Sequence, residues 1–121
     1  MKKILSIDDS LPTQTLIEYT LNREGHNVFR ISDEKDALDS LSRESFDLIM
    51  LNITSKEIGW ANILGNIKND SRHSTIPVLT LSNRLSEDKT EEASRLGAKD
   101  FINKPFKPDE LVDAVSRLLK D

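Results

Sequence analysis

Two kinds of periodicity alternate along this chain, and their alternation limits the folds that it can adopt. Short apolar runs of strand length recur five times, at residues 3–7, 27–31, 48–51, 76–81 and 100–102. After each run, apolar residues recur three and four positions apart, as on one face of a helix. Strict alternation of strands and helices is typical of a parallel sheet with helices on both faces. The sequence therefore predicts a doubly wound α/β fold with a five-stranded parallel sheet and five helices.

Residues that favour helix ends place several boundaries. Ser32 or Asp33 is the expected cap of the second helix, and Ser86 is the expected cap of the fourth. A glycine is favoured just after a helix, so the fourth helix is predicted to end at Gly97. The third helix is expected to bury one face made of Ile58, Ile63, Leu64 and Ile67.

Length and composition favour a single soluble domain. The chain has 121 residues, of which 36% are hydrophobic and 31% charged, so residues 1–121 are expected to form one domain with its own core. The net charge of −4 argues against nonspecific nucleic-acid binding, which depends on Lys and Arg. There is no cysteine, no apolar run of membrane-spanning length and no signal peptide, so a cytoplasmic protein is expected.

Polar residues cluster where the predicted strands end. In open α/β sheets, ligands bind beyond the carboxyl ends of the strands. The first strand is followed by Asp8 and Asp9, and the third by Asn52. The fourth leads to Ser82 and Asn83, and the fifth to Asn103, Lys104 and Pro105. The sequence therefore places a candidate site at this edge, although each residue alone is compatible with an ordinary loop.

Three segments of the sequence together resemble a known family. SIDDS, PVLTLS and GAKDFINKPF occur in order, and the last is close to a pattern that ends in Lys-Pro-Phe. In this respect the chain resembles the receiver domains of two-component response regulators, over essentially its whole length. The resemblance implies a flavodoxin-like sheet with strand order 2-1-3-4-5.

The resemblance also implies roles for individual residues. Asp8 and Asp9 are similar to the acidic pair that holds Mg²⁺. Ser82 and Lys104 are similar to the hydroxyl and the ammonium that contact a phosphoryl group. Phe101 resembles an aromatic switch, although a simple core position is the alternative. The peptide bond from Lys104 to Pro105 is expected to be cis.

Asn52 occupies the position of the phosphorylated aspartate, and here the chain departs from the family. In a receiver, phosphoryl transfer to this position needs a carboxylate nucleophile, whereas an amide oxygen is a poor one. Asn52 can still offer its oxygen to a metal. The formal charges of Asp8, Asp9 and Lys104 sum to −1, where an aspartate at position 52 would make −2, so weakened Mg²⁺ binding is expected.

The loop after Asn52 also departs from the family. Ser55 and Lys56 stand where the family usually has Met-Pro. The glycine of the family's usual Asp-Gly, a few residues later, comes one residue early here, as Gly59, and Trp60 follows it. Lys56 brings a cation near the site, and we expect it to replace part of the positive charge that a weakly bound metal ion no longer supplies. Trp60 is either an exposed contact or a helix-packing residue. These neighbouring departures favour a natural degenerate receiver over an ordinary one whose aspartate has been replaced.

The predicted function is phosphorylation-independent protein recognition in phosphorelay signalling, without enzyme activity. Expected partners are a histidine kinase or a downstream protein, with a homodimer through the fourth helix, fifth strand and fifth helix as a further assembly. No nucleic acid or membrane partner is expected. One alternative is a working phosphoacceptor that uses Thr54, Ser55 or Ser82. Another is a sensor of a small anion bound between Ser82, Lys104 and Lys56.

Two other groups of residues are given ordinary surface roles. His26 and His73 lie in polar, loop-like surroundings, and both are expected to be solvated. A run of acidic residues is expected to form a solvated face of the fourth helix, in a region that often contacts partners in the family: Glu87, Asp88, Glu91 and Glu92.

Overall fold

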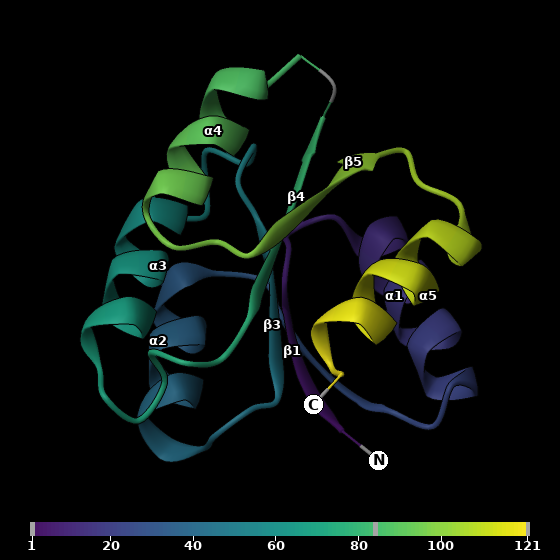
Figure 1. Cartoon of the computed structure of the whole chain (residues 1–121), viewed down its shortest axis with the longest axis horizontal. Coiled ribbons are helices and arrows are strands. Elements are labelled where there is room, and N and C mark those ends of the chain that lie inside the picture. Colours follow the sequence, from purple (N-terminus) through teal and green to yellow (C-terminus); the bar gives the residue numbers. More distant parts are fainter. Residues whose placement is uncertain (1, 84, 121) are drawn as a thin grey trace.

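The computed structural model describes residues 2–83 and 85–120, and it contains one parallel sheet flanked by two layers of helices (Figure 1). The strands are β1 (Lys3–Ile7), β2 (Asn27–Ile31), β3 (Leu48–Asn52), β4 (Val78–Asn83) and β5 (Asp100–Lys104). All four strand pairings are parallel, in the order β2-β1-β3-β4-β5. The predicted doubly wound, flavodoxin-like topology is therefore confirmed.

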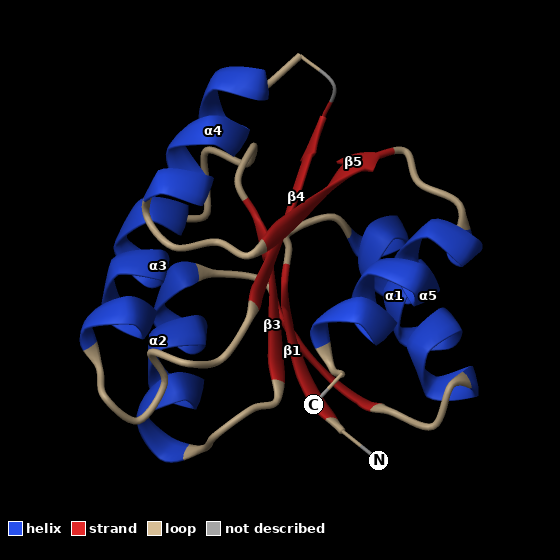
Figure 2. Ribbon diagram, in the orientation of Figure 1, coloured by secondary structure: helices blue, strands red, loops and turns tan. Residues whose placement is uncertain are grey.

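Five helices cover the two faces of the sheet, as Figure 2 shows in blue. They are α1 (Leu11–Arg23), α2 (Glu34–Arg43), α3 (Trp60–Asn69), α4 (Glu87–Arg95) and α5 (Pro108–Leu118). Helices α1 and α5 lie on one face, and α2, α3 and α4 lie on the other. Within the described residues, no helix is long and apolar enough to span a membrane.

Side-chain alternation along β3 explains how one strand serves two cores. All five of its residues are buried. Leu48 and Met50 belong to the hydrophobic cluster beneath α1 and α5, while Ile49 and Leu51 belong to the cluster beneath α2, α3 and α4. Successive side chains on a strand point to opposite faces, so a continuous apolar run is what a doubly covered central strand requires.

Local chemistry sets most of the helix ends. Asp33, rather than Ser32, caps α2, because its carboxylate accepts a hydrogen bond of 2.8 Å from the backbone N–H of Asp36. Gly97 follows α4 with φ of +113°, a conformation that favours glycine. Ser86 is the N-cap residue of α4, as predicted, but its hydroxyl donates to Asn83 Oδ1 at 2.9 Å and makes no capping hydrogen bond to the helix backbone.

Some predicted boundaries also need correction. Helix α3 begins at Trp60, so Ile58 is buried in the preceding loop rather than on the helix. Strand β4 begins at Val78, because Ile76 is held in a turn by the hydrogen bond from its N–H to the carbonyl of His73, 2.9 Å. Both β4 and β5 run further than the apolar runs indicated, through Asn83 and Lys104.

The prediction that His73 is solvated is wrong. Its side chain is only 3% exposed, and Nε2 lies 2.7 Å from the carbonyl oxygen of Leu41. A carbonyl can only accept, so this nitrogen carries the proton and donates. The bond gives a partner to one of the last carbonyls of α2, which the helix itself leaves free. His26 is half-buried, and burial lowers its pKa.

Candidate functional site

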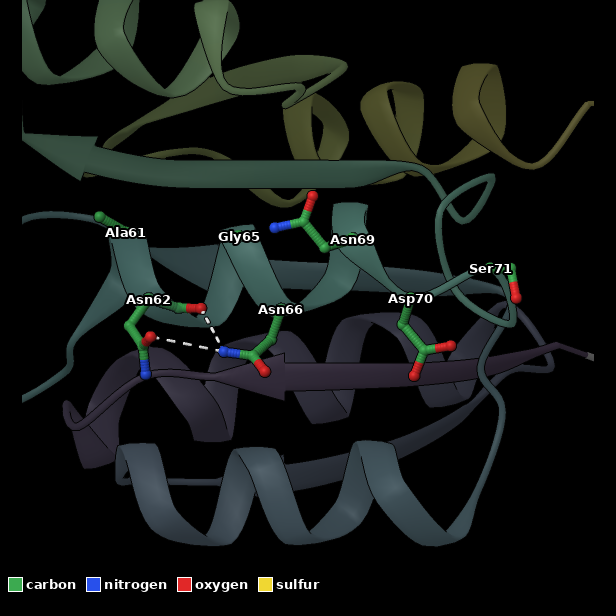
Figure 3. Close-up of a pocket in the computed structure, with 7 residues that line it drawn as sticks. All are labelled: Ala61, Asn62, Gly65, Asn66, Asn69, Asp70 and Ser71. Atoms are coloured by element: carbon green, nitrogen blue, oxygen red, sulfur yellow. Dashed lines mark hydrogen bonds between the residues drawn. The ribbon is translucent and has the colours of Figure 1, made fainter.

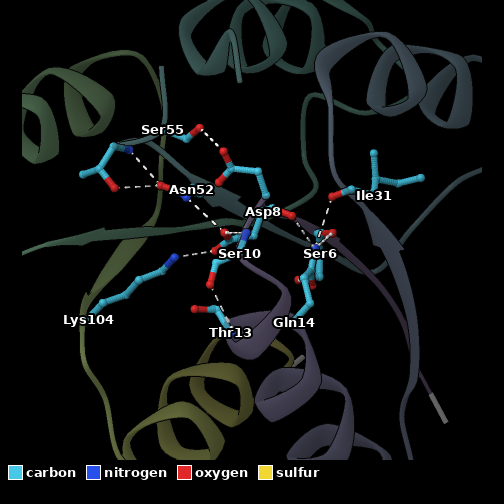
Figure 4. Close-up of polar contacts among 11 residues, drawn as sticks. Ser6, Asp8, Ser10, Thr13, Gln14, Ile31, Asn52, Ser55 and Lys104 are labelled. Carbon is cyan, nitrogen blue, oxygen red and sulfur yellow. Dashed lines mark hydrogen bonds and ion pairs between the residues drawn. The ribbon is translucent and has the colours of Figure 1, made fainter. Parts of the chain in front are cut away.

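A buried carboxylate, Asp8, forms the centre of a cluster of polar side chains at the carboxyl edge of the sheet, which we call the Asp8 pocket (Figure 4). Its Oδ2 lies 2.7 Å from Lys104 Nζ, which comes from the end of β5. Its Oδ1 accepts hydrogen bonds from the backbone N–H of Ser10 (2.9 Å) and from Nδ2 of Asn52 (3.1 Å). Asp8 is fully buried, and burying a charge is costly unless partners surround it. Here both carboxylate oxygens have such partners.

Asn52 lies between Asp8 and the loop that follows β3. Its side chain is 3% exposed, and its Oδ1 accepts from both the backbone N–H (2.8 Å) and the hydroxyl (2.9 Å) of Thr54. The neighbours fix the orientation of the amide, because the carboxylate of Asp8 needs a donor and the N–H of Thr54 needs an acceptor. The amide nitrogen therefore faces the pocket, and the amide oxygen faces the loop.

Asp9 is exposed and lies against the same loop. Its Oδ2 accepts a hydrogen bond of 2.5 Å from the hydroxyl of Ser55. That hydroxyl in turn accepts from the backbone N–H of Glu57, 3.1 Å away. The structure therefore brings Asp8, Asp9 and Asn52 together, as predicted from their positions after the strands, and adds Ser55 as the link between Asp9 and the loop.

Ser82 contacts α4 and β5 instead of the Asp8 pocket. Its hydroxyl lies 3.1 Å from Thr90 Oγ1 and donates to Asn103 Oδ1 at 3.3 Å. Lys104 is paired with Asp8, and Lys56 is an exposed side chain of the loop. These contacts do not bring Ser82, Lys104 and Lys56 together around one point, so they do not favour the anion-sensor alternative.

The two aromatic residues singled out from the sequence have different surroundings. Phe101, on β5, is 51% exposed, which excludes the simple core position. It lines a cavity of about 200 Å³ between α4 and β5, together with Thr80 and Thr90. Trp60 is half-buried and packs against the core beneath α2, α3 and α4, as a helix-packing residue would. The Lys104–Pro105 peptide bond is cis, as the resemblance implied.

A second hollow, of about 550 Å³, lies on the outer face of α3 (Figure 3). Its lining residues are Ala61, Asn62, Gly65, Asn66, Asn69, Asp70 and Ser71. None of them belongs to the pocket around Asp8, and Asp70 is the one charged member. Because titratable groups do not converge there, the carboxyl edge of the sheet remains the candidate site.

Sequence reasoning missed Gln14 as a site residue, and it considered Thr54 only as an alternative acceptor, not as a partner of Asn52. Thr54 makes two hydrogen bonds to Asn52. Gln14 is 3% exposed and makes four hydrogen bonds around the end of β1. A signal for Gln14 was available, since it lies three residues before Ile17 on the face of α1 that is buried. A polar residue on such a face needs buried partners.

The arrangement fits magnesium poorly. Mg²⁺ prefers an octahedral shell of oxygen ligands. Asp8 and Asp9 offer carboxylates, but Asn52 presents nitrogen toward Asp8, and Lys104 already occupies the other oxygen of Asp8. Across residues 2–83 and 85–120, no group of three His, Cys, Asp or Glu side chains is placed to hold a metal ion. An ion would have to turn the amide and displace the ammonium.

Curated proteins with similar sequences include two from Bacillus subtilis (strain 168). The alkaline phosphatase synthesis transcriptional regulatory protein PhoP is 31% identical over 98% of this chain, which spans about half of PhoP (49%). Sporulation initiation phosphotransferase F is 30% identical, with 98% of this chain and 94% of that protein covered.

A solved structure shares the fold of this chain, and a family model matches most of its length. The receiver domain of sensor histidine kinase PA1611 from Pseudomonas aeruginosa PAO1 matches with a TM-score of 0.87, at 24% identity over 98% of this chain and 97% of that one. That structure is described with a magnesium ion coordinated in its active site cleft. The model of the response regulator receiver domain matches residues 4–116. The chain therefore belongs to the response regulator receiver domain family.

Proposed function

We propose that residues 1–121 form a cytoplasmic receiver domain that signals through protein contacts and does not accept a phosphoryl group at position 52. The observation that carries the proposal is the hydrogen bond from Asn52 Nδ2 to Asp8 Oδ1, 3.1 Å long. Aspartyl phosphate forms when a carboxylate oxygen attacks phosphorus, and the group at this position is an amide that donates toward the pocket. The domain thus works as a binding module rather than as an enzyme.

The charge balance of the pocket supports the same proposal. In a receiver with aspartate at position 52, two carboxylates would face each other, and a divalent cation would relieve their repulsion. Here a neutral amide and the ammonium of Lys104 compensate Asp8. Mg²⁺ would therefore gain less on binding, and its affinity should be lower than in a receiver with three acidic groups.

Partners of the family are signalling proteins, namely histidine kinases and downstream effectors. For this chain we propose that such a partner, or a second copy, binds the face formed by α4, β5 and α5. Two apolar side chains are exposed there, Leu96 at 44% and Phe101 at 51%. The acidic run Glu87, Asp88, Glu91 and Glu92 is exposed on α4, as predicted. Aromatic side chains are enriched at protein interfaces, and the rims of interfaces are polar.

The decisive experiment is phosphorylation by a small donor. The protein is incubated with Mg²⁺ and acetyl phosphate, and its intact mass is recorded beside Asn52→Asp. The expected result is one added phosphoryl group on the variant and none on the natural chain. Asn52→Asp combined with Asp8→Asn is the matched control, because it has the acceptor but lacks the buried carboxylate.

A phosphoryl group on the natural chain would overturn the proposal. Peptide mapping would then assign it to Thr54, Ser55 or Ser82, the hydroxyls considered from the sequence. In the structure all three hydroxyls are engaged in hydrogen bonds, to Asn52, Asp9 and Asn103 respectively. If neither the natural chain nor the variant is modified, the pocket itself is defective, and Asn52 is not the reason.

A further inference from the structure

Gln14 joins the ends of β1 and β2 from beneath the Asp8 pocket (Figure 4). Its Nε2 lies 2.9 Å from the carbonyl oxygen of Ser6, 3.0 Å from that of Asp8 and 3.1 Å from that of Ile31. Its Oε1 accepts a hydrogen bond of 2.7 Å from the hydroxyl of Ser6. An amide has two hydrogens, so the three carbonyls share them. One side chain of α1 therefore contacts the backbone of both strands.

The position of Asp8 explains why these contacts matter. The pairing of β1 with β2 ends at Ile7 and Ile31, so the carbonyl of Asp8 lies beyond the ladder. The N–H of Asp8 still donates to the carbonyl of Ile31, at 3.0 Å. Gln14 provides a donor to the carbonyl of Asp8, as a backbone acceptor beyond the end of a strand pairing requires. The peptide groups on both sides of Asp8 are thereby held.

We infer that Gln14 is the positioning residue of the pocket: it sets where the carboxylate of Asp8 lies relative to Asn52 and Lys104. In the described contacts, Gln14 does not touch the carboxylate of Asp8, the amide of Asn52 or the ammonium of Lys104. It acts through the backbone of Asp8. Groups that orient a ligand-bearing residue from behind commonly change the affinity of a site by about tenfold or more. The inference rests on geometry alone and holds whether or not the chain accepts a phosphoryl group.

No other side chain of similar size can make this set of contacts. Methionine has nearly the same length but no donor, so it would remove the donor to the carbonyls and the acceptor for the hydroxyl of Ser6, while the carbonyl of Ile31 would keep the N–H of Asp8 as a partner. Glutamate keeps the shape but replaces the NH₂ group with an oxygen that can only accept and that would face the carbonyl oxygens. Gln14→Met and Gln14→Glu are therefore the informative substitutions, and the second should disturb the pocket more.

The test follows two signals that report on the carboxylate of Asp8 by nuclear magnetic resonance. One is the side-chain NH₂ pair of Asn52, and the other is hydrogen exchange at the amide of Ser10, because both groups donate to Asp8 Oδ1. In Gln14→Met we expect the Asn52 signals to shift and Ser10 to exchange about fivefold faster, beyond any change in global stability.

Thr20→Val is the matched control, since Thr20 is buried on the same helix but lies away from the pocket. It should lower stability without moving either signal. Ser6→Ala removes only the hydrogen bond to Gln14 Oε1, and it should shift both signals in the same direction by a smaller amount.

If the Asn52 and Ser10 signals of Gln14→Met are the same as those of Thr20→Val, the inference is overturned. Gln14 would then only fill space in the core. If Gln14→Met does not fold, Ser6→Ala decides: unchanged Asn52 and Ser10 signals in that variant would also overturn it. Neither result depends on phosphorylation, so a failure here is distinct from a failure of the proposed function.

Discussion

The pocket around Asp8 and the flank formed by α4, Ser82 and Phe101 lie at the same edge of the sheet, but they are held in different ways. In the pocket, Asp8, Asn52 and Gln14 are at least 97% buried, and hydrogen bonds or an ion pair surround each of them. On the flank, Ala93 is the residue of α4 that is fully buried, and Phe101 is half-exposed beside a cavity of about 200 Å³.

This difference indicates which part of the domain can change conformation. A buried polar network is rigid when every member has a partner, because each alternative leaves a polar group unsatisfied. A helix with little buried apolar surface opens at low free-energy cost. The pocket should therefore stay in one arrangement, while the α4 flank can adjust to a partner. Four substitutions test that contrast, in order of decreasing expected effect.

Lys104→Met should be the most damaging, with a loss of about 3 kcal/mol in the free energy of unfolding. The substitution removes the ammonium 2.7 Å from Asp8 Oδ2 and leaves a fully buried carboxylate without its counter-charge. Urea unfolding followed by the fluorescence of Trp60, the single tryptophan, measures the loss. Arg117→Met is the control, because its ion pair with Asp100 is exposed, and about 0.5 kcal/mol is expected. Equal losses would remove the contrast between pocket and surface.

Asn52→Asp should lower stability by about 2 kcal/mol when no divalent cation is present. The amide of Asn52 donates to Asp8, whereas a carboxylate would place two negative oxygens about 3 Å apart. Mg²⁺ should recover much of the loss, and it should affect the natural chain far less. Thermal unfolding with and without Mg²⁺ measures both effects. A variant as stable as the natural chain without Mg²⁺ would contradict the proposed charge balance.

Thr90→Val should weaken the attachment of α4 to the sheet, with an expected loss of about 1 kcal/mol in the free energy of unfolding. The hydroxyl of Thr90 lies 3.1 Å from that of Ser82 and ties α4 to the sheet. Hydrogen exchange should rise along α4 and remain unchanged along α1. If α1 and the Asp8 pocket respond as strongly as α4, the two regions unfold together and the contrast fails.

Asp70→Asn should have the smallest effect, and its size should depend on pH. A side-chain hydrogen bond from Arg72 lowers the pKa of Asp70 from its ordinary value of 3.8 to about 2. A carboxyl group with a lowered pKa stabilises the fold above its unfolded pKa, and the contribution is lost as the pH falls through the folded value. By chemical denaturation, the variant should be slightly less stable at pH 7, and the difference should shrink as the pH falls from 3.8 toward 2. Because the pair is exposed, salt should reduce the difference.

Much of the fold and part of the site could be predicted from the sequence, for identifiable reasons. The short apolar run of β3 and the glycine after α4 are local signals, and they placed these elements correctly. Parallel strands bring their carboxyl ends to one edge, so the closeness of Asp8, Asn52 and Lys104 followed from the order of the elements. Local signals failed for His73, whose polar neighbours in sequence gave no sign of the carbonyl of Leu41 in space.

The element order, the residues at the strand ends and the amide at position 52 can be read from the sequence alone. The direction of that amide, the contact of Ser82 with Thr90 and the contact of Gln14 with the backbone of Asp8 are seen only in the folded chain. The physical reason is that periodicity and caps depend on neighbours in the chain. A hydrogen bond depends on distance and direction between groups from separate elements, and packing sets both.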